Sequence, residues 1–162
     1  MARNLDIINT ERLTLRGIKE EDTPEIVCWR VNPDVYSFFK SPRRINIEEH
    51  LNWYHNLYLD NNNRFDWMCI EKTTNKKIGV FGLMRNRDTV EVNYLLAPEA
   101  QHKGYASESI DSLIKYAKEK WNITKFIAEI HKDNTPSIAL IKRLGFTLER
   151  NSDDFVIYGI EV

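Results

Sequence analysis

One stretch of the chain limits its fold more than any other. Between residues 89 and 130, a strand-like run, a helix-like run and a second strand-like run follow one another. The two strand-like runs are residues 89–96 and 125–130, and residues 106–120 between them have the length and pattern of a helix. A connection of this length allows the two strands to lie side by side in parallel. We therefore expect a mixed α/β sheet with at least one parallel pair.

The remaining elements are expected to be short and mostly antiparallel neighbours, because their connections are short. Apolar and polar residues alternate over residues 12–18, which predicts a strand. Thr23-Pro24 has the form of a helix start, and Asn32-Pro33-Asp34 is typical of a helix end. We find no repeat or linker and treat residues 1–162 as a single domain. The further elements expected are a strand at 12–18, a helix at 48–58 with Leu51, Tyr54, Leu57 and Tyr58 on one face, a loop at 60–64, a hairpin from 67–70 and 78–84, a helix at 136–143, and strands at 146–148 and 155–160.

Composition excludes several classes of function. The 162 residues carry 23 Lys and Arg against 24 Asp and Glu, a formal net charge of −1, so no global basic field attracts nucleic acid. The sequence has no apolar run of membrane-spanning length, and its first six residues lack the apolar core of a signal peptide. We expect a cytoplasmic protein with no membrane or nucleic-acid partner, present as a monomer or a homodimer.

Cysteine and histidine are too few and too scattered to suggest a disulfide framework or a metal site. Cys28 and Cys69 each stand among apolar neighbours, which favours two buried free thiols over a disulfide. The four histidines show no zinc-ligand spacing. We expect no metal.

A glycine loop connects the strand at 89–96 to the following helix. Its residues, Gln101, His102, Lys103, Gly104, Tyr105, Ala106 and Ser107, run into the helix start. Amide groups at a helix N-terminus lack intrahelical partners and carry partial positive charge, so they can hold an anion such as a pyrophosphate. Gly104 and Ala106 leave the backbone accessible, and Lys103 adds a cation. The pattern alone is weak evidence for phosphate binding, since it arises by chance in about one sequence of this length in six. The alternative is an ordinary turn in which Gly104 relieves backbone strain before the helix.

A second motif in the right order makes the pattern more specific. After the strand 125–130 come Asn134-x-x-Ser137 and Leu144-Gly145-Phe146, and the whole arrangement resembles the GCN5-related N-acetyltransferase (GNAT) superfamily. The resemblance implies a mostly antiparallel sheet with a splayed parallel central pair and helices on both faces. It implies that the glycine loop binds the pyrophosphate of acetyl-CoA and that a bulged strand including Leu95 and Leu96 pairs with the pantetheine arm. Asn134 would contact the arm near the thioester.

Acetyl transfer to an amine needs a base for the ammonium proton, a donor for the oxyanion and an acid for the leaving thiolate. Glu91 and Glu129 are carboxylates in otherwise apolar strands, and each has the alternative of an outward-facing or salt-bridged structural group. We favour Glu129 as the base, because its spacing to Asn134 resembles related acetyltransferases. A backbone N–H near Leu96 is the expected oxyanion donor.

At the position of the acid that protonates the leaving thiolate, this chain departs from the family pattern. Many members have a tyrosine seven residues after the asparagine, where this chain has Ile141. Tyr94 or water takes the role, or the thiolate leaves unaided. The loss of the tyrosine also leaves open a different class of function, a non-catalytic acyl-CoA-binding module.

The N-terminal half is expected to select the acceptor. The segments around Arg30, His50 and Trp53 are similar to those of enzymes that acetylate UDP-linked 4-amino sugars in pseudaminic-acid-type biosynthesis, and more loosely to the ribosomal-protein acetyltransferase branch. Arg30 and His50 would then face nucleotide phosphates or sugar hydroxyls, and Trp53 would face the uracil or the sugar ring. The alternatives are that Arg30 is a surface charge at a helix end, that His50 is a solvated helix residue and that Trp53 is part of the core. We expect acetyl-CoA as co-substrate and a small-molecule amine as acceptor, with a protein N-terminus or a polyamine as the alternative.

Overall fold

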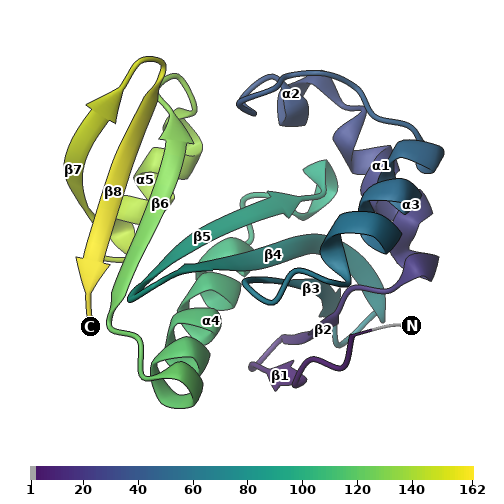
Figure 1. Cartoon of the computed structure of the whole chain (residues 1–162), viewed down its shortest axis with the longest axis horizontal. Helices are drawn as coiled ribbons and strands as arrows, with labels where there is room; N and C mark the ends of the chain where they lie inside the picture. Colours follow the sequence, from purple (N-terminus) through teal and green to yellow (C-terminus); the bar gives the residue numbers. More distant parts are fainter. Residues whose placement is uncertain (1–2) are drawn as a thin grey trace.

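The computed structural model of the chain describes residues 3–162, apart from the side chain of Tyr36; Met1 and Ala2, at the start of the segment considered above as a signal peptide, lie outside the described residues. Figure 1 shows the arrangement of the elements. The strands are β1 (Ile8–Asn9), β2 (Leu13–Gly17), β3 (Arg64–Glu71), β4 (Lys76–Asn86), β5 (Thr89–Leu96), β6 (Lys125–His131), β7 (Thr147–Ser152) and β8 (Phe155–Glu161). The helices are α1 (Thr23–Arg30), α2 (Pro33–Tyr36), α3 (Ile47–Trp53), α4 (Tyr105–Trp121) and α5 (Thr135–Arg143), with 3-10 turns at Glu20–Asp22 and Pro98–Ala100 and a π-helical turn at Tyr54–Tyr58.

The strands form one sheet in the order β1-β2-β3-β4-β5-β6-β8-β7. Every adjacent pair is antiparallel except β5 and β6, which are parallel and connected through α4. The mixed, mostly antiparallel α/β sheet expected from the sequence is therefore confirmed.

The parallel pair is short, and its strands then diverge. Only three residue pairs join β5 to β6, from Thr89 with Lys125 to Glu91 with Ile127. Beyond them β5 stays paired with β4 through Leu96, and β6 stays paired with β8 through His131. The sheet thus consists of two halves that touch at one end and separate at the other, as Figure 1 shows. The splayed pair expected from the family resemblance is present.

Helices cover both faces of the sheet, and the alternation of side chains along β3 shows which helix lies on which face. Trp67 packs against Tyr116 of α4 with ring centroids 5.5 Å apart. Arg64 comes three residues before Trp67, so its side chain points to the opposite face of the sheet. There its guanidinium lies 4.9 Å from the ring centre of Trp53 of α3. One face therefore belongs to α4, and the opposite face to α1, α3 and the π-helical turn.

Helix α1 corrects the expectation that both cysteines are buried. Its residues Ile26, Val27 and Trp29 are buried, whereas Cys28 is exposed. At about 100° per residue, Cys28 points away from the other three. Cys69 of β3 is buried as expected, and the sulfhydryl groups are both free.

The helix predicted at residues 48–58 is α-helical only as far as Trp53, and its last residues form a wider turn. α3 stops at Trp53, and a π-helical turn follows in which the Leu59 N–H donates to the Tyr54 carbonyl oxygen at 3.1 Å. The wider turn keeps Tyr54 and Tyr58 buried but turns Leu57 outward, where 64% of it is exposed. The expectation that Leu57 shares the buried face is wrong for this reason. Within residues 3–162, no helix is both long and apolar enough to span a bilayer.

A buried ionic network holds α1 against the sheet. The carboxylate of Asp22, fully buried at the start of α1, accepts hydrogen bonds from both terminal nitrogens of Arg16 at 2.9 Å. It also contacts Lys77 of β4 at 2.8 Å and accepts from the backbone N–H of Lys19. Burial by itself raises the pKa of Asp22, but the bonds from Arg16 and Lys77 outweigh it and lower that pKa. Asp22 therefore connects β2, α1 and β4 as an ionised group.

Replacing this carboxylate is expected to be costly. Asp22→Asn removes the buried charge that pairs with the partly buried cations of Arg16 and Lys77, so the free energy of unfolding should fall by about 3 kcal/mol. Urea denaturation at neutral pH measures the change. Asp111→Asn, at the exposed ion pair of Asp111 with Lys115 on α4, serves as control and should change stability by less than about 0.5 kcal/mol. A loss below about 1 kcal/mol for Asp22→Asn would contradict the role assigned to the network.

Candidate functional site

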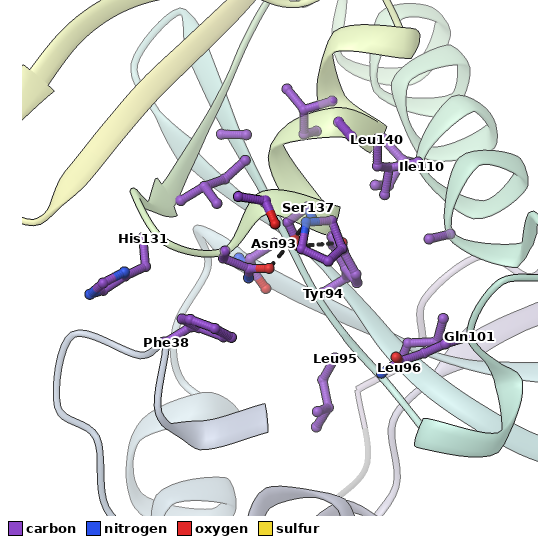
Figure 2. A pocket seen from close by; sticks show the side chains of 18 of the residues that line it. Phe38, Asn93, Tyr94, Leu95, Leu96, Gln101, Ile110, His131, Ser137 and Leu140 are labelled. Atoms are coloured by element: carbon purple, nitrogen blue, oxygen red, sulfur yellow. Dashed lines mark hydrogen bonds between the residues drawn. The ribbon is translucent and has the colours of Figure 1, made fainter. Parts of the chain in front are cut away.

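A large cavity, of about 780 Å³, lies where β5 and β6 separate. Tyr94 and Ile141 line it on the α4 side of the sheet, and Phe38, Phe39 and Glu129 line it on the other side. The cavity therefore passes through the opening between the two halves of the sheet. Figure 2 shows Tyr94, Leu95 and Leu96 along β5, with His131 and Phe38 across from them.

The strand β5 presents unpaired backbone groups to this opening. The Ala97 N–H donates to the Ile78 carbonyl at 2.8 Å, so the pair Gly79–Leu96 is a non-hydrogen-bonded one. By the alternation of an antiparallel ladder, the N–H groups of Val92, Tyr94 and Leu96 point away from β4. Val92 adjoins the last pair with β6, Glu91 with Ile127, so the N–H groups of Tyr94 and Leu96 are the ones that face the divergence. The expectation of a bulge near Leu96 is wrong, because β5 keeps a continuous register with β4 through Leu96. Divergence from β6 exposes the same groups without a bulge.

The glycine loop leads directly into α4. Gly104 is the residue before the helix and has φ of +79°, a left-handed conformation suited to glycine. Helix α4 has 17 residues, and the first-turn residues Tyr105, Ala106 and Ser107 line the cavity, as do Gln101, His102 and Gly104. The free amides of this first turn can therefore face an anion held in the cavity. Lys103 does not line it.

Arg12 of the N-terminal segment braces the loop from outside the cavity. Its guanidinium donates to the Lys103 carbonyl at 2.9 Å and to the Glu108 carboxylate at 2.7 Å. It also lies 4.4 Å from the ring centre of Tyr105, whose hydroxyl donates to Glu71. Sequence reasoning missed Arg12, because the contact joins segments about 90 residues apart.

The two candidate carboxylates lie on the same face of the sheet. Glu91 is in register with Ile127 of β6, and Glu129 follows two residues later on that strand, so both point towards the α1 and α3 side. Burial raises the pKa of Glu91, and the charge of Glu129 raises it further. Glu129 lines the large cavity, whereas Glu91 lines a smaller neighbouring one of about 340 Å³. Within residues 3–162, no third His, Cys, Asp or Glu joins them in a metal-binding group.

Glu129 is not free in this structure. Its carboxylate oxygen lies 2.9 Å from the Nζ of Lys40, which belongs to the irregular segment between α2 and α3. The side chain of Glu129 is 17% exposed, and that of Lys40 is 66% exposed. No local pattern in the sequence indicates this contact, because it joins residues 89 positions apart.

Tyr94 lies on the opposite side of the opening. Its hydroxyl is 2.6 Å from the Ser137 Oγ, and its ring is stacked on Phe81. Burial raises the pKa of Tyr94, so the phenol is protonated at neutral pH. Asn134 lines the cavity and caps α5, its side-chain oxygen accepting from the Ser137 N–H. Ile141 is buried on the cavity wall and carries no proton donor.

Arg30, His50 and Trp53 do not line the large cavity; they form a cluster behind it. The Arg30 guanidinium lies 5.0 Å from the ring centre of Phe39, which is on the cavity wall. The rings of His50 and Trp53 are 5.3 Å apart, and Arg64 covers Trp53. Their proposed contacts with an acceptor stay a prediction.

His50 is buried, which excludes the alternative of a solvated helix residue. Only 5% of it is exposed, and its Nε2 has no hydrogen-bond partner. Burial lowers its pKa from 6.5 to about 4, with help from the positive charges of Arg30 and Arg64. Burial also lowers the pKa of Arg30, as do the charges of Arg64 and Arg43. The cluster therefore holds several cations around a neutral imidazole.

Comparison with known proteins was made for the sequence and for the fold. Residues 12–147 match the model of the GNAT acetyltransferase domain. The N-acetyltransferase p20 of Bacillus licheniformis is 29% identical over 152 residues, covering 90% of this chain and 84% of p20. The acetyltransferase PseH of Campylobacter jejuni is 27% identical over 146 residues, covering 88% of this chain and 90% of PseH.

Two solved structures with ligands share the fold. The ribosomal L7/L12 alpha-N-protein acetyltransferase RimL in complex with coenzyme A has a TM-score of 0.83 at 20% identity, covering 97% of this chain and 98% of RimL. The spermidine N-acetyltransferase of Vibrio cholerae with CoA and spermine has a TM-score of 0.80 at 21% identity, covering 94% of this chain and 96% of that one. At this identity the likeness concerns the fold alone.

The buried imidazole predicts a specific pH dependence of stability. The pKa of His50 is lowered on folding from 6.5 to about 4, so the unfolded chain binds the extra proton between these values and stability falls as the pH drops from 6.5. Between pH 7 and pH 5, His50 should account for a loss of about 2 kcal/mol in the free energy of unfolding. Urea denaturation at both pH values compares the wild type with His50→Gln. The pH-dependent loss should be smaller in the variant by that amount, and an equal loss in both proteins would contradict the assignment.

Proposed function

The chain belongs to the GNAT acetyltransferase family and is an N-acetyltransferase, and from this premise we propose that it transfers the acetyl group of acetyl-CoA to the primary amine of an amino-sugar nucleotide. One observation carries the proposal. A single cavity extends from the glycine loop, along the free amides of β5, to the carboxylate Glu129.

The residues on the α4 side fit acetyl-CoA. The first-turn amides of α4 and Gly104 offer donors for the pyrophosphate, with no side chain at Gly104 to hold it away. The N–H groups of Tyr94 and Leu96 are directed into the opening, where the amides of a pantetheine arm can complete the ladder. An arm lying along β5 would place its thioester in the opening, and we propose a backbone N–H of β5 in the stretch from Tyr94 to Leu96 as the oxyanion donor.

Glu129 is the proposed base because it lines the cavity on the acceptor side. It accepts the proton of the incoming ammonium, so that the amine attacks in its neutral form. Glu91 lies beside it as the second carboxylate of the pair, and its raised pKa reflects burial and the nearby charge of Glu129. Glu91 is thus suited to receive the proton next, towards the smaller polar cavity that it lines.

Tyr94 is the proposed proton donor to the leaving thiolate. It replaces the tyrosine that Ile141 does not supply, and it approaches the opening from the strand rather than from α5. Its hydroxyl bond with Ser137 orients the phenol and gives it a partner through which the lost proton can be restored. Base and acid then lie on opposite faces of the sheet, with the reacting groups between them.

The cations of the N-terminal layer favour an acceptor with negative charge. Arg30 has no ion-pair partner among residues 3–162, and its Nε is buried without a hydrogen bond. Burial lowers the pKa of Arg30 most, the like charges of Arg64 and Arg43 lower it further, and Glu49, which pairs with Arg43, raises it. A diphosphate group beside Phe39 would compensate these charges. The similarity to PseH supports the same class of acceptor.

A protein N-terminus or a polyamine is the alternative acceptor. The shared fold of RimL and the spermidine acetyltransferase supports it, as does the pair of carboxylates facing the acceptor side. A polycation such as spermidine would meet Arg30 and Arg64 unfavourably. We therefore rank it second.

Acetyl-CoA binding is expected to depend on Gly104. A side chain at φ of +79° strains the backbone, and its Cβ would lie 3.3 Å from an Arg12 nitrogen. Gly104→Ala should raise the Kd for CoA about tenfold, measured by titration calorimetry. Gly145→Ala is the matched control, since Gly145 also has a positive φ, of +97°, but lies outside the cavity. It should destabilise the protein by about 1 kcal/mol and leave the Kd unchanged. Equal effects on Kd would contradict the loop assignment.

Catalysis is expected to require Glu129. A thiol-release assay with acetyl-CoA compares UDP-4-amino sugars, N-terminal peptides and spermidine as acceptors. Glu129→Gln should lower kcat/KM for the best acceptor by about 100-fold or more, because a general base is lost. The control Glu119→Gln, at an exposed glutamate of α4, should retain wild-type activity.

These measurements test the acceptor class, the base and the reaction separately. A higher kcat/KM for spermidine or a peptide than for any UDP-amino sugar would overturn the acceptor class and leave acetyl transfer intact. Unchanged kinetics in Glu129→Gln would remove Glu129 as the base. Binding of acetyl-CoA without thiol release with any acceptor would argue against the proposed reaction.

A further inference from the structure

Lys40 occupies the place on Glu129 that an acceptor ammonium needs. Its Nζ lies 2.9 Å from the carboxylate oxygen. Among residues 3–162, it is the one lysine paired with a carboxylate that lines the large cavity; the other lysine ion pairs involve carboxylates elsewhere. A primary amine therefore lies beside the proposed base without any added substrate.

The segment that carries Lys40 is held over the cavity by aromatic contacts. Phe38 packs against His131 of β6 with ring centroids 5.6 Å apart, and Phe39 lies under the Arg30 guanidinium. The Lys40 Nζ is also 6.0 Å from the ring centre of Phe155 on β8. Phe38 and Phe39 both line the cavity, and Figure 2 shows Phe38 facing it beside His131. These contacts bring the lysine to the acceptor-side mouth of the opening between β5 and β6.

From this geometry we propose that Lys40 is a site of self-acetylation, modified within its own chain when acetyl-CoA is bound and no other acceptor is present. The inference rests on the proposed function of the same cavity. The Lys40 ammonium gives its proton to the Glu129 carboxylate, and the neutral Nζ forms an amide bond to the acetyl carbon. The carbon–sulfur bond of the thioester breaks, and the CoA thiolate takes a proton from Tyr94 to leave as the free thiol. The nitrogen releases its second proton to solvent water as the amide forms, and Tyr94 regains a proton from solvent, so that one proton, held by Glu129, is released overall.

Acetylation would also remove the ion pair. An amide nitrogen carries no positive charge, so acetylated Lys40 no longer attracts the Glu129 carboxylate. The flexible four-carbon stem makes the exchange between paired and unpaired positions easy. The modified chain then leaves Glu129 accessible to an external amine.

The test follows acetylation of the full-length protein alone with acetyl-CoA, by intact mass and peptide mapping over time. Lys40 should be acetylated about tenfold faster or more than Lys118, an exposed lysine of α4. The first-order rate should not change on dilution of the protein, because the reaction is intramolecular. Lys40→Arg, which keeps the charge, should lose this modification, and Glu129→Gln should slow it about 100-fold.

The controls separate this inference from the proposed function. Acetyl transfer to an external amine, combined with Lys40 modified no faster than Lys118, would overturn self-acetylation and leave the function standing. A rate at Lys40 that rises in proportion to protein concentration would show transfer between chains and overturn the intramolecular step. Absence of both thiol release with every acceptor and modification of Lys40 would overturn the proposed function and the inference together.

Discussion

The separation of β5 from β6 is the constraint on which the rest of the site depends. Three residue pairs hold the two halves of the sheet together, and each strand then follows its own antiparallel partner. A strand in the middle of a sheet normally has both edges satisfied, so an internal divergence leaves backbone donors without partners. Here the donors of Tyr94 and Leu96 face a cavity rather than another strand. The divergence therefore offers hydrogen-bond donors from the backbone alone, and it requires no particular side chain.

The same opening allows the two faces of the sheet to carry different chemistry. Because side chains alternate along a strand, Glu91 and Tyr94 of β5 point to opposite faces. The carboxylates lie beneath the N-terminal helices, and the phenol lies towards α5. In a closed sheet these groups could not act on one bond. In this sheet the proposed base and acid reach the same passage from two sides, which keeps the acid away from the negative charge of the carboxylate pair.

The sequence was informative where the determinants were local. Residues 89–96 were predicted as a strand with the bounds that β5 has, since its apolar pattern is bounded by a turn and by Pro98. The parallel relation of β5 and β6 followed from the length of the connection. The expectation of a bulge near Leu96 is wrong, because the resemblance implies exposed amides on this strand but does not show that divergence from β6, rather than a bulge, exposes them. Leu57 was misplaced because a π-helical turn, which no period of 3.6 residues foresees, rotates the chain after Trp53.

The acceptor side was hard to predict for a different reason. Its contacts join the irregular segment after α2 to distant strands, as in the pair Lys40–Glu129 and the packing of Phe38 on His131. Such contacts leave no periodic trace in the sequence. Arg30 and His50 are identified from the resemblance, but the burial of His50 and the position of Arg30 behind Phe39 are not.

The burial of polar groups has an energetic consequence for the two sides of the opening. All the buried side-chain atoms without a hydrogen-bond partner in residues 3–162, including Arg30 Nε, His50 Nε2 and Asp66 Oδ1, belong to the N-terminal helical layer or to the strand beneath it. Each unpaired buried polar group costs about 1–3 kcal/mol. None of these atoms belongs to α4 or α5, and on that side the groups left without partners are backbone amides of β5 that face the cavity. The unpaired side-chain atoms include the carboxylate oxygens Glu25 Oε2 and Asp66 Oδ1 as well as two nitrogens, and their residues do not line the large cavity. A ligand in the cavity therefore reaches the backbone donors of β5 but not these side-chain atoms, so binding recovers the cost of unpaired polar groups along the strand.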